Sequence, residues 1–173
     1  KIGSERSSRI LKSLDTLKPV NNIKEEWDLS ELLDRVVNSK VEEFPGITIN
    51  RTYSAKPRVS CYEEKLIMLF HYLLDNAFDA VAGSATPVVT LALEALEGPS
   101  GKWACITISD NGRGIPKELR SRIFEPFFTT KEIGKGAGLG LSIAQGIAAE
   151  HKGTLELLDG IGPGATFRIL LPL

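Results

Sequence analysis

One amphipathic helix constrains the fold of this chain more than any other stretch of its sequence. Between residues 62 and 81, apolar side chains recur at three- and four-residue steps: Leu66, Leu69, Phe70, Leu73, Ala77, Ala80 and Val81. Such spacing places these side chains on one face of an α-helix. A helix with one apolar face needs another layer of structure to cover that face. We therefore expect this helix to pack against a sheet.

The flanking sequence supplies strands for that sheet. Residues 87–96 and 103–109 are rich in β-forming residues and flank a Gly-Pro-Ser-Gly turn at 98–101. Five further elements are expected: a helix opened by the capping-box pattern Asp28-x-x-Glu31, strands over residues 47–53, 154–158 and 165–171, and a helix over 139–151. These elements amount to three helices and about five strands. They predict an α+β fold, a two-layer α/β sandwich.

Two segments do not belong to this sandwich. Residues 4–24 carry a narrow apolar stripe, which is typical of a helix in a bundle or coiled coil. Residues 112–140 hold six of the sixteen glycines and little periodicity, so we expect a long loop with a short helix over 117–123. Loops of this length are usually functional or disordered.

Composition excludes several classes of function. The net charge of −1 provides no overall field that would attract nucleic acid or acidic lipid. Cys61 and Cys105 lie among apolar neighbours, without metal-ligand spacing, and are expected to be buried thiols in a reducing compartment. The longest apolar runs are too short to span a bilayer. We expect a cytoplasmic fragment, without membrane contact of its own, of a longer protein that can be membrane-attached.

A glycine-rich stretch opens the helix expected over residues 139–151. Its spacing fits neither the P-loop pattern nor the dinucleotide-binding fingerprint. The backbone N–H groups of Gly138, Leu139 and Gly140 would nevertheless open a helix, where the dipole attracts anions. The stretch alone leaves two interpretations open, a phosphate site or a flexible loop that ends in a helix cap.

Two further clusters carry polar residues at positions suited to nucleotide chemistry. Asp110 ends a predicted strand and is followed by Gly112 and Gly114, either as a plain Asx turn or as an acceptor for the exocyclic amine of adenine. Asn76 and Asp79, three residues apart, share one side of the long helix. An asparagine oxygen is a suitable ligand for Mg²⁺. For the neighbouring Asp75, a solvated helix face remains the alternative.

Together these motifs resemble one family. Four segments occur in the order and spacing of the N box, first glycine box, F box and second glycine box of sensor histidine kinases: Asn76-Ala-x-x-Ala80, Asp110-x-Gly-x-Gly114, Phe124-Glu-Pro-Phe-Phe-Thr-Thr-Lys131 and Gly136-Ala-Gly-Leu-Gly-Leu141. The resemblance covers about residues 28–173 and points to the catalytic ATP-binding domain of the GHKL superfamily. It implies a mixed sheet of about five strands, three helices on one face, a mobile ATP lid, and an N-terminal bundle-type helix.

The resemblance implies a role for each motif residue. At the adenine end, Asp110 would accept the amine, Gly112 and Gly114 would shape the pocket, and Thr166 would support it. At the other end, Asn76 would coordinate Mg²⁺, and Asp79 would lie near the phosphates by way of metal, water or arginine. Lys131 would reach the phosphates and, with Asn76, count as catalytic. The remaining implied contacts are the lid over residues 113–138, anchored by Phe124, Phe127 and Phe128, and the phosphate-wrapping residues Gly136, Gly138, Leu139 and Gly140.

The resemblance also implies domains and partners. Residues 1–25 would end a helical dimerisation and phosphoacceptor domain, and residues 26–173 would form the catalytic domain. A protein-histidine kinase of this kind would use ATP and Mg²⁺ and phosphorylate a histidine on its own upstream helix, within a homodimer. The phosphoryl group would then pass to a response-regulator receiver domain.

Neither histidine of this chain is expected to be that acceptor. His71 lies within the most apolar helix, and His151 ends the last helix. We expect His151 to be structural and cationic, because a cation at a helix C-terminus interacts favourably with the helix dipole. The acceptor would lie upstream of the sequence.

Three alternatives remain beside the histidine kinase. The first is a serine-phosphorylating GHKL kinase, and the second is an ATP-sensing module without catalysis. The third is a conformational ATPase, which Tyr72 disfavours because a tyrosine occupies the position of the catalytic glutamate and is a poor base at neutral pH.

Overall fold

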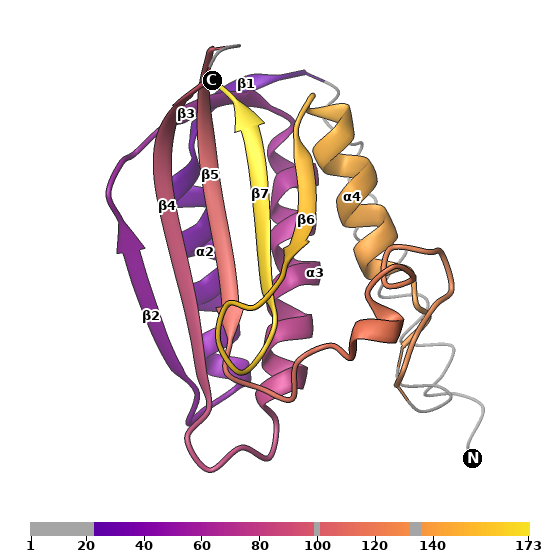
Figure 1. The fold of residues 1–173 in the computed structure, drawn as a ribbon. Coiled ribbons are helices and arrows are strands. Elements are labelled where there is room, and N and C mark those ends of the chain that lie inside the picture. Colours follow the sequence, from indigo (N-terminus) through magenta and orange to yellow (C-terminus); the bar gives the residue numbers. More distant parts are fainter. Residues whose placement is uncertain (1–22, 99–100, 132–135) are drawn as a thin grey trace, which may run out of the picture.

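The computed structural model describes residues 23–98, 101–131 and 136–173. It has two layers, a five-stranded sheet and three helices that cover one of its faces (Figure 1). This arrangement confirms the predicted α+β sandwich. The predicted N-terminal bundle helix falls almost entirely on residues 1–22, which lie outside the described residues.

The central sheet is mixed, as expected. Its strands lie in the order β2, β4, β5, β7, β6, with β2 parallel to β4 and the other neighbours antiparallel. The strands have these bounds: β2 Thr48–Tyr53, β4 Val88–Gly98, β5 Gly101–Asp110, β6 Thr154–Leu158 and β7 Thr166–Pro172. The side chains of β4, β5 and β7 that face the helices are buried, so the core lies between the sheet and the helical layer.

Three helices form the second layer: α2 Leu29–Glu43, α3 Glu63–Val81 and α4 Gly140–Glu150. The helix α3 is the predicted long helix, and it buries eight side chains. The helix α2 begins after Asp28, whose side chain accepts a hydrogen bond from the backbone N–H of Ser30 at 2.8 Å. This cap satisfies one of the free N–H groups of the first turn, as the sequence pattern predicted.

A second, two-stranded sheet was not predicted. The strand β1 (Glu25–Asp28) pairs antiparallel with β3 (Arg58–Cys61), beginning with Glu25 opposite Cys61. Each strand has only four residues, and β1 reads Glu-Glu-Trp-Asp, which gives no alternating pattern of useful length. The expected boundary between residues 25 and 26 falls within β1.

The segment before α4 also differs in detail from the prediction. A 3-10 helix of three residues (Lys117–Leu119) replaces the helix expected over 117–123. Its backbone bonds join residues three apart, from the N–H of Leu119 to Pro116 and from the N–H of Arg120 to Lys117. The following turns continue this tighter pattern, so a full α-helical turn does not form.

Other expectations from composition can be compared with the structure. Cys61 and Cys105 are buried free thiols, as predicted. Within the described ranges, every helix is too short or too polar to cross a lipid bilayer.

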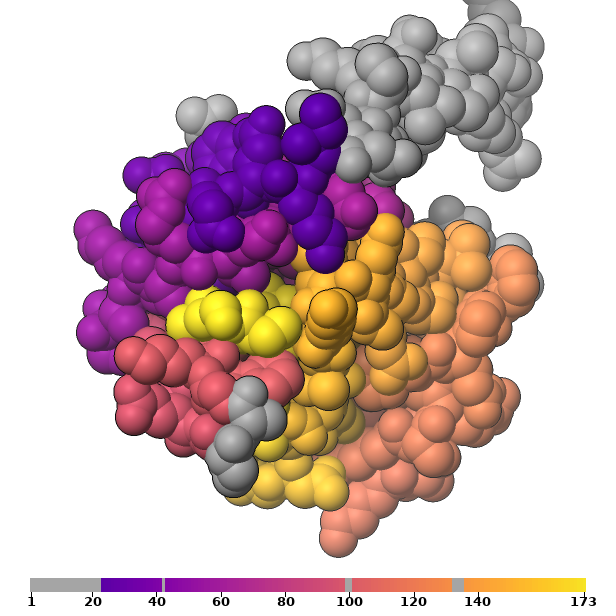
Figure 2. All heavy atoms as spheres, turned by 90° about the horizontal axis from the view of Figure 1, so that it is seen from above, coloured from indigo at the N-terminus to yellow at the C-terminus, as the bar shows by residue number. Residues whose placement is uncertain are grey.

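Figure 2 shows the segment before α4 (salmon) beside α4 (orange) on one side of the molecule, while the purple N-terminal elements occupy the other.

Candidate nucleotide-binding site

A cavity of about 830 Å³ opens between α3, the end of β5, the start of α4 and the segment that joins β5 to α4. We call residues 113–138 the lid segment. The structure describes this segment except for residues 132–135. The cavity brings together nine of the eleven predicted site residues: Asn76, Asp79, Asp110, Gly114, Lys131, Gly136, Gly138, Leu139 and Gly140. From Asn76 to Gly140, these nine residues span 64 positions of the sequence and line one space, while Gly112 and Thr166 lie outside its lining.

Asp110 lies at the C-terminal end of β5 and is buried. Its Oδ1 accepts hydrogen bonds from the backbone N–H groups of Gly112 at 2.9 Å and Ala165 at 3.3 Å. Burial raises the pKa of the carboxyl, against the lowering effect of these two bonds. Among the described residues nothing donates a hydrogen bond to Oδ2, so this oxygen remains as an acceptor at the cavity.

Close backbone packing explains the glycines around Asp110. A Cβ on Gly112 would lie 2.3 Å from the carbonyl oxygen of Ala80 in α3, and a Cβ on Gly164 would lie 2.1 Å from that of Asp110. Any other residue at either position would push the turn away from its neighbour. Gly112 therefore shapes the site from behind. Gly164 is a further site-forming residue, which none of the four sequence motifs contains.

Thr166 also lies behind the cavity wall. It is 2% exposed, and its hydroxyl lies 3.0 Å from the hydroxyl of Ser109. The same hydroxyl donates to the carbonyl oxygen of Ile161 at 3.3 Å. These bonds tie the start of β7 to the end of β5, next to Asp110.

Polar side chains of α3 form one wall of the cavity. Tyr72, Asp75, Asn76 and Asp79 all line it. The Asn76 side chain is half-buried and has no hydrogen-bond partner in the described part of the chain. The ring of Tyr72 packs close to the start of α4, because a Cβ on Gly140 would lie 3.1 Å from that ring. Glycine thus lets the N-terminus of α4 approach α3.

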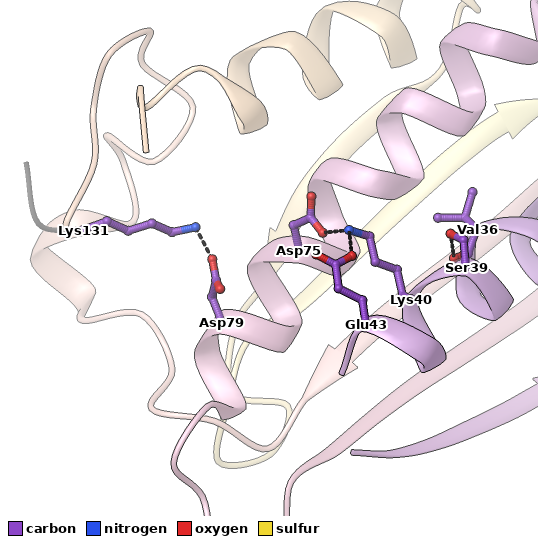
Figure 3. A network of polar contacts seen from close by, with 7 residues as sticks. All are labelled: Val36, Ser39, Lys40, Glu43, Asp75, Asp79 and Lys131. Carbon is purple, nitrogen blue, oxygen red and sulfur yellow. Dashed lines mark hydrogen bonds and ion pairs between the residues drawn. The ribbon is translucent and has the colours of Figure 1, made fainter. Parts of the chain in front are cut away.

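Each of the two aspartates on this wall is paired with a lysine from a different element (Figure 3). Lys40 of α2 binds Asp75, with Nζ 2.6 Å from Oδ1, and Lys131 of the lid segment binds Asp79. Burial alone would lower the pKa of Lys40, but the hydrogen bonds and charges of Asp75 and Glu43 outweigh it and raise the pKa. Lys40 was not predicted as part of the site, because no motif contains it.

The three phenylalanines of the lid segment do not behave alike. Phe124 packs edge-on against Phe167, with ring centroids 6.4 Å apart, and Phe128 lines the cavity. Phe127 is 75% exposed and has a φ of 66°. The prediction that it anchors the lid is wrong, because its side chain is exposed to solvent and does not pack against the rest of the domain as those of Phe124 and Phe128 do.

The glycine-rich stretch leads into α4 as predicted. Gly138 has a φ of +68°, and a Cβ there would lie 2.5 Å from the backbone of Phe127. Only glycine fits this turn without strain. The helix α4 begins at Gly140, and Gly136, Gly138, Leu139 and Gly140 all line the cavity. The free N–H groups and the positive end of the helix dipole therefore border the cavity.

The histidines lie apart from this chemistry. His151 is 4% exposed, its Nε2 accepts a hydrogen bond from the N–H of Tyr62 at 3.0 Å, and its Nδ1 lies 2.8 Å from the carbonyl oxygen of Ile147. Burial lowers its pKa. The expectation of a cation is therefore wrong, because an imidazole that accepts at Nε2 and donates at Nδ1 is neutral. Burial also lowers the pKa of the half-buried His71 within α3.

A carboxylate at a strand end, an asparagine on the facing helix and a glycine-rich helix start define a nucleotide-binding α+β domain. The chain belongs to the family of histidine kinase-, DNA gyrase B- and HSP90-like ATPases, whose family model matches residues 61–173. Within that family it is an ATP-binding domain of the sensor histidine kinase type.

Individual relatives agree with this assignment. Sporulation kinase C of Bacillus subtilis is 31% identical over 96% of this chain and 33% of its own length. The mycobacterial sensor histidine kinase MprB superposes with a TM-score of 0.75 at 27% identity, over 87% of this chain and 97% of that one. Full-length ShkA, solved in complex with AMPPNP, has a TM-score of 0.73 at 27% identity, over 86% and 31%. The chain spans between 8% and 36% of the length of the first three curated relatives.

Proposed function

We propose that this domain binds ATP with Mg²⁺ and transfers the γ-phosphoryl group to a histidine on a helix upstream of it. The observation that carries the proposal is the single cavity shared by Asp110, Asn76 and the start of α4. Its two ends differ in chemistry. At one end, the buried carboxylate of Asp110 is a hydrogen-bond acceptor. The other end is lined by the Asn76 amide, by Lys131 and by the N–H groups at the start of α4.

Asp110 would select adenine. Its Oδ2 accepts hydrogen bonds only, so it suits the exocyclic amine of adenine and repels the carbonyl that guanine carries at that position. The N–H groups of Gly112 and Ala165 hold Oδ1 and thereby orient Oδ2. Thr166 supports this arrangement from behind, through its contact with Ser109.

Asn76 would hold Mg²⁺. Its amide has no hydrogen-bond partner in the described residues and its oxygen is a ligand type that Mg²⁺ accepts. In the same ranges, no group of three or more His, Cys, Asp or Glu residues could hold a metal. This fits an ion that takes few protein ligands and completes its shell with phosphate oxygens and water. Bound there, Mg²⁺ would neutralise charge on the triphosphate.

The triphosphate would lie between α3 and the start of α4. Gly136, Gly138, Leu139 and Gly140 border this space, and their N–H groups would donate to phosphate oxygens. Lys131 would add a positive charge from the lid segment. In the transfer, the bond from the γ-phosphorus to the bridging oxygen breaks, a phosphorus–nitrogen bond to histidine forms, and ADP leaves. The domain contributes mainly position and charge neutralisation.

The acceptor would be supplied by another segment. Both nitrogens of His151 are engaged within the fold, and His71 is half-buried in α3. We propose that the acceptor lies on a dimeric helical domain of the longer protein, to which residues 1–25 belong, with residues 26–173 as the catalytic domain. From there the phosphoryl group would pass to a response-regulator aspartate. The domain itself would act on the cytoplasmic side of the membrane, away from nucleic acid.

The chemical stability of the phosphorylated product tests this function. We expect the full-length protein, incubated with ATP labelled at the γ-phosphate, to acquire phosphate that is labile in acid and stable in base, the behaviour of phosphohistidine. Asn76→Ala should abolish the labelling. Acid-stable phosphate, or steady ATP hydrolysis by the isolated domain, would contradict the proposal.

A further inference from the structure

Two aspartates one helical turn apart on α3 differ in how firmly their lysine partners are held. Asp75 and Asp79 both line the cavity, and both are ion-paired (Figure 3). Asp75 binds a lysine from the fixed helical layer, whereas Asp79 binds one from the lid segment. The Lys40–Asp75 pair thus joins two helices of the helical layer, whereas the Lys131–Asp79 pair joins α3 to the lid segment.

Lys40 is fixed in place by several contacts. Its side chain is 12% exposed, and its Nζ lies 2.6 Å from Asp75 and 2.9 Å from Glu43. The ammonium also lies 5.7 Å from the centre of the Phe44 ring. A charge with two carboxylate partners and little solvent contact loses all of these when it moves away. Lys40 is therefore firmly held beside Asp75 and neutralises part of its charge.

Lys131 is held much less firmly. Its side chain is 30% exposed, that of Asp79 is 44% exposed, and Asp79 is its one carboxylate partner among the described residues. Its stem packs beside Gly136, since a Cβ on that glycine would lie 3.2 Å from the Lys131 Cδ. The stem of Lys131 therefore lies beside a glycine of the stretch that leads to α4, while its ammonium binds an aspartate of α3.

We propose that Asp79 is a positioning residue that competes with the triphosphate for Lys131. The inference rests on the proposed function, which assigns the phosphates to this end of the cavity. Without nucleotide, Asp79 holds Lys131 against α3. When a triphosphate binds, Lys131 exchanges one anionic partner for another, and the Asp79 carboxylate is left beside the phosphates.

This exchange favours nucleotide that carries a metal ion over metal-free nucleotide. The freed carboxylate of Asp79 repels a triphosphate that carries its full negative charge, and repels it less once a divalent cation has neutralised part of that charge. Asp79 therefore discriminates against metal-free nucleotide. Because the pair is partly exposed, the expected effect on affinity is modest, about two- to fivefold.

Binding of AMPPNP, an ATP analogue, tests the proposal without turnover. Dissociation constants for AMPPNP, with and without Mg²⁺, and for adenosine would be measured on the 173-residue chain by titration calorimetry. We expect Asp79→Asn to tighten metal-free AMPPNP about fivefold and the Mg²⁺ complex about twofold, and to leave adenosine unchanged. In a Lys131→Met background the gain for metal-free AMPPNP should fall to about twofold, because no lysine remains to be released.

The matched control is Glu156→Gln. Glu156 pairs with Arg168 at 2.8 Å, with similar exposure to solvent, but lies outside the cavity lining. It should leave all three affinities unchanged. Weaker metal-free binding by Asp79→Asn, a gain undiminished by Lys131→Met, or an equal gain for adenosine would overturn the role of Asp79. If the wild-type chain binds no AMPPNP at all, both the proposed function and the role of Asp79 are wrong. This outcome differs from the three above, which overturn only the role of Asp79.

Discussion

The two walls of the nucleotide cavity are built on different physical principles. The wall of α3 is a regular helix that buries eight side chains in the core, including Phe70 and Phe78, which are fully buried. The described part of the lid segment has a single 3-10 helix, one buried apolar side chain, Ile123, and an exposed phenylalanine. Burial of apolar side chains therefore fixes the position of α3, whereas a few turns and contacts fix the position of the lid segment.

This difference indicates where the domain can change without unfolding. Removing a contact from the lid segment alters a local turn, whereas removing one from α3 leaves a hole between helix and sheet. A site with one fixed and one adaptable wall can bind its ligand precisely and still admit it. Variants that separate stability from nucleotide affinity test the contrast.

The largest expected effect is on the stability of the fixed wall. Phe70→Ala should lower the free energy of unfolding by about 3–5 kcal/mol, because it opens a cavity in a close-packed core. Phe127→Ala removes an equally large ring that is 75% exposed, and should change stability by less than about 0.5 kcal/mol. Urea denaturation followed by circular dichroism measures both. Similar losses in the two variants would break the comparison.

A second variant should uncouple stability from binding at the end of β5. We expect Asp110→Asn to weaken ATP binding about ten- to a hundredfold, through loss of a charged hydrogen bond to adenine, while the free energy of unfolding stays the same or rises. Burial of the Asp110 charge opposes folding, so removal of that charge is tolerated. Calorimetric titration measures the affinity, and urea denaturation of the same sample measures the stability. A variant that loses both affinity and stability would count against this role of Asp110.

The raised pKa of Asp110 also predicts opposite pH effects on binding and stability. Because the folded-state pKa lies above the unfolded value, the cost of the buried charge is present above the folded pKa and is relieved as the pH falls through it. Over the same range the acceptor for adenine is lost by protonation, so affinity for ATP should fall. Asp110→Asn should remove this pH dependence of both quantities.

Gly138 and Gly146 form a matched pair of glycines. Gly138→Ala should weaken ATP binding about tenfold, because a Cβ would lie 2.5 Å from the backbone of Phe127 and the turn must shift. Gly146 lies within α4 with no atom within 4 Å of an added Cβ, so Gly146→Ala should raise stability by up to about 1 kcal/mol and leave affinity unchanged. Unchanged affinity in the Gly138 variant would mean that this turn does not shape the site.

The smallest effect distinguishes the two lysines. Lys40→Met should lower the free energy of unfolding by about 1 kcal/mol, since it leaves Asp75 and Glu43 without their shared partner. Lys131→Met should leave stability within about 0.5 kcal/mol of the wild type and weaken ATP binding instead. Thermal unfolding with and without nucleotide would detect a reversal of this order.

Much of the fold could be predicted because its signals are local. Helical periodicity predicted α3, the cap at Asp28 predicted the start of α2, and apolar runs between glycine turns predicted the strands of the main sheet. The strands β1 and β3 escaped prediction because four residues carry too little pattern, and each is stabilised by a partner about 30 or more positions away. The 3-10 helix at 117–119 is equally too short for periodicity to specify.

The candidate site divides in the same way. The sequence by itself determined the residue types: an acidic strand end, an asparagine on an amphipathic helix, and glycines where the backbone must turn or pack closely. Only the tertiary structure decided their partners. It paired Lys131 with Asp79, 52 positions away, placed Lys40 on Asp75, turned Phe127 outward and made His151 neutral. Periodicity and turn chemistry act between near neighbours in the chain, whereas charge pairing and burial depend on which distant segments the fold brings together.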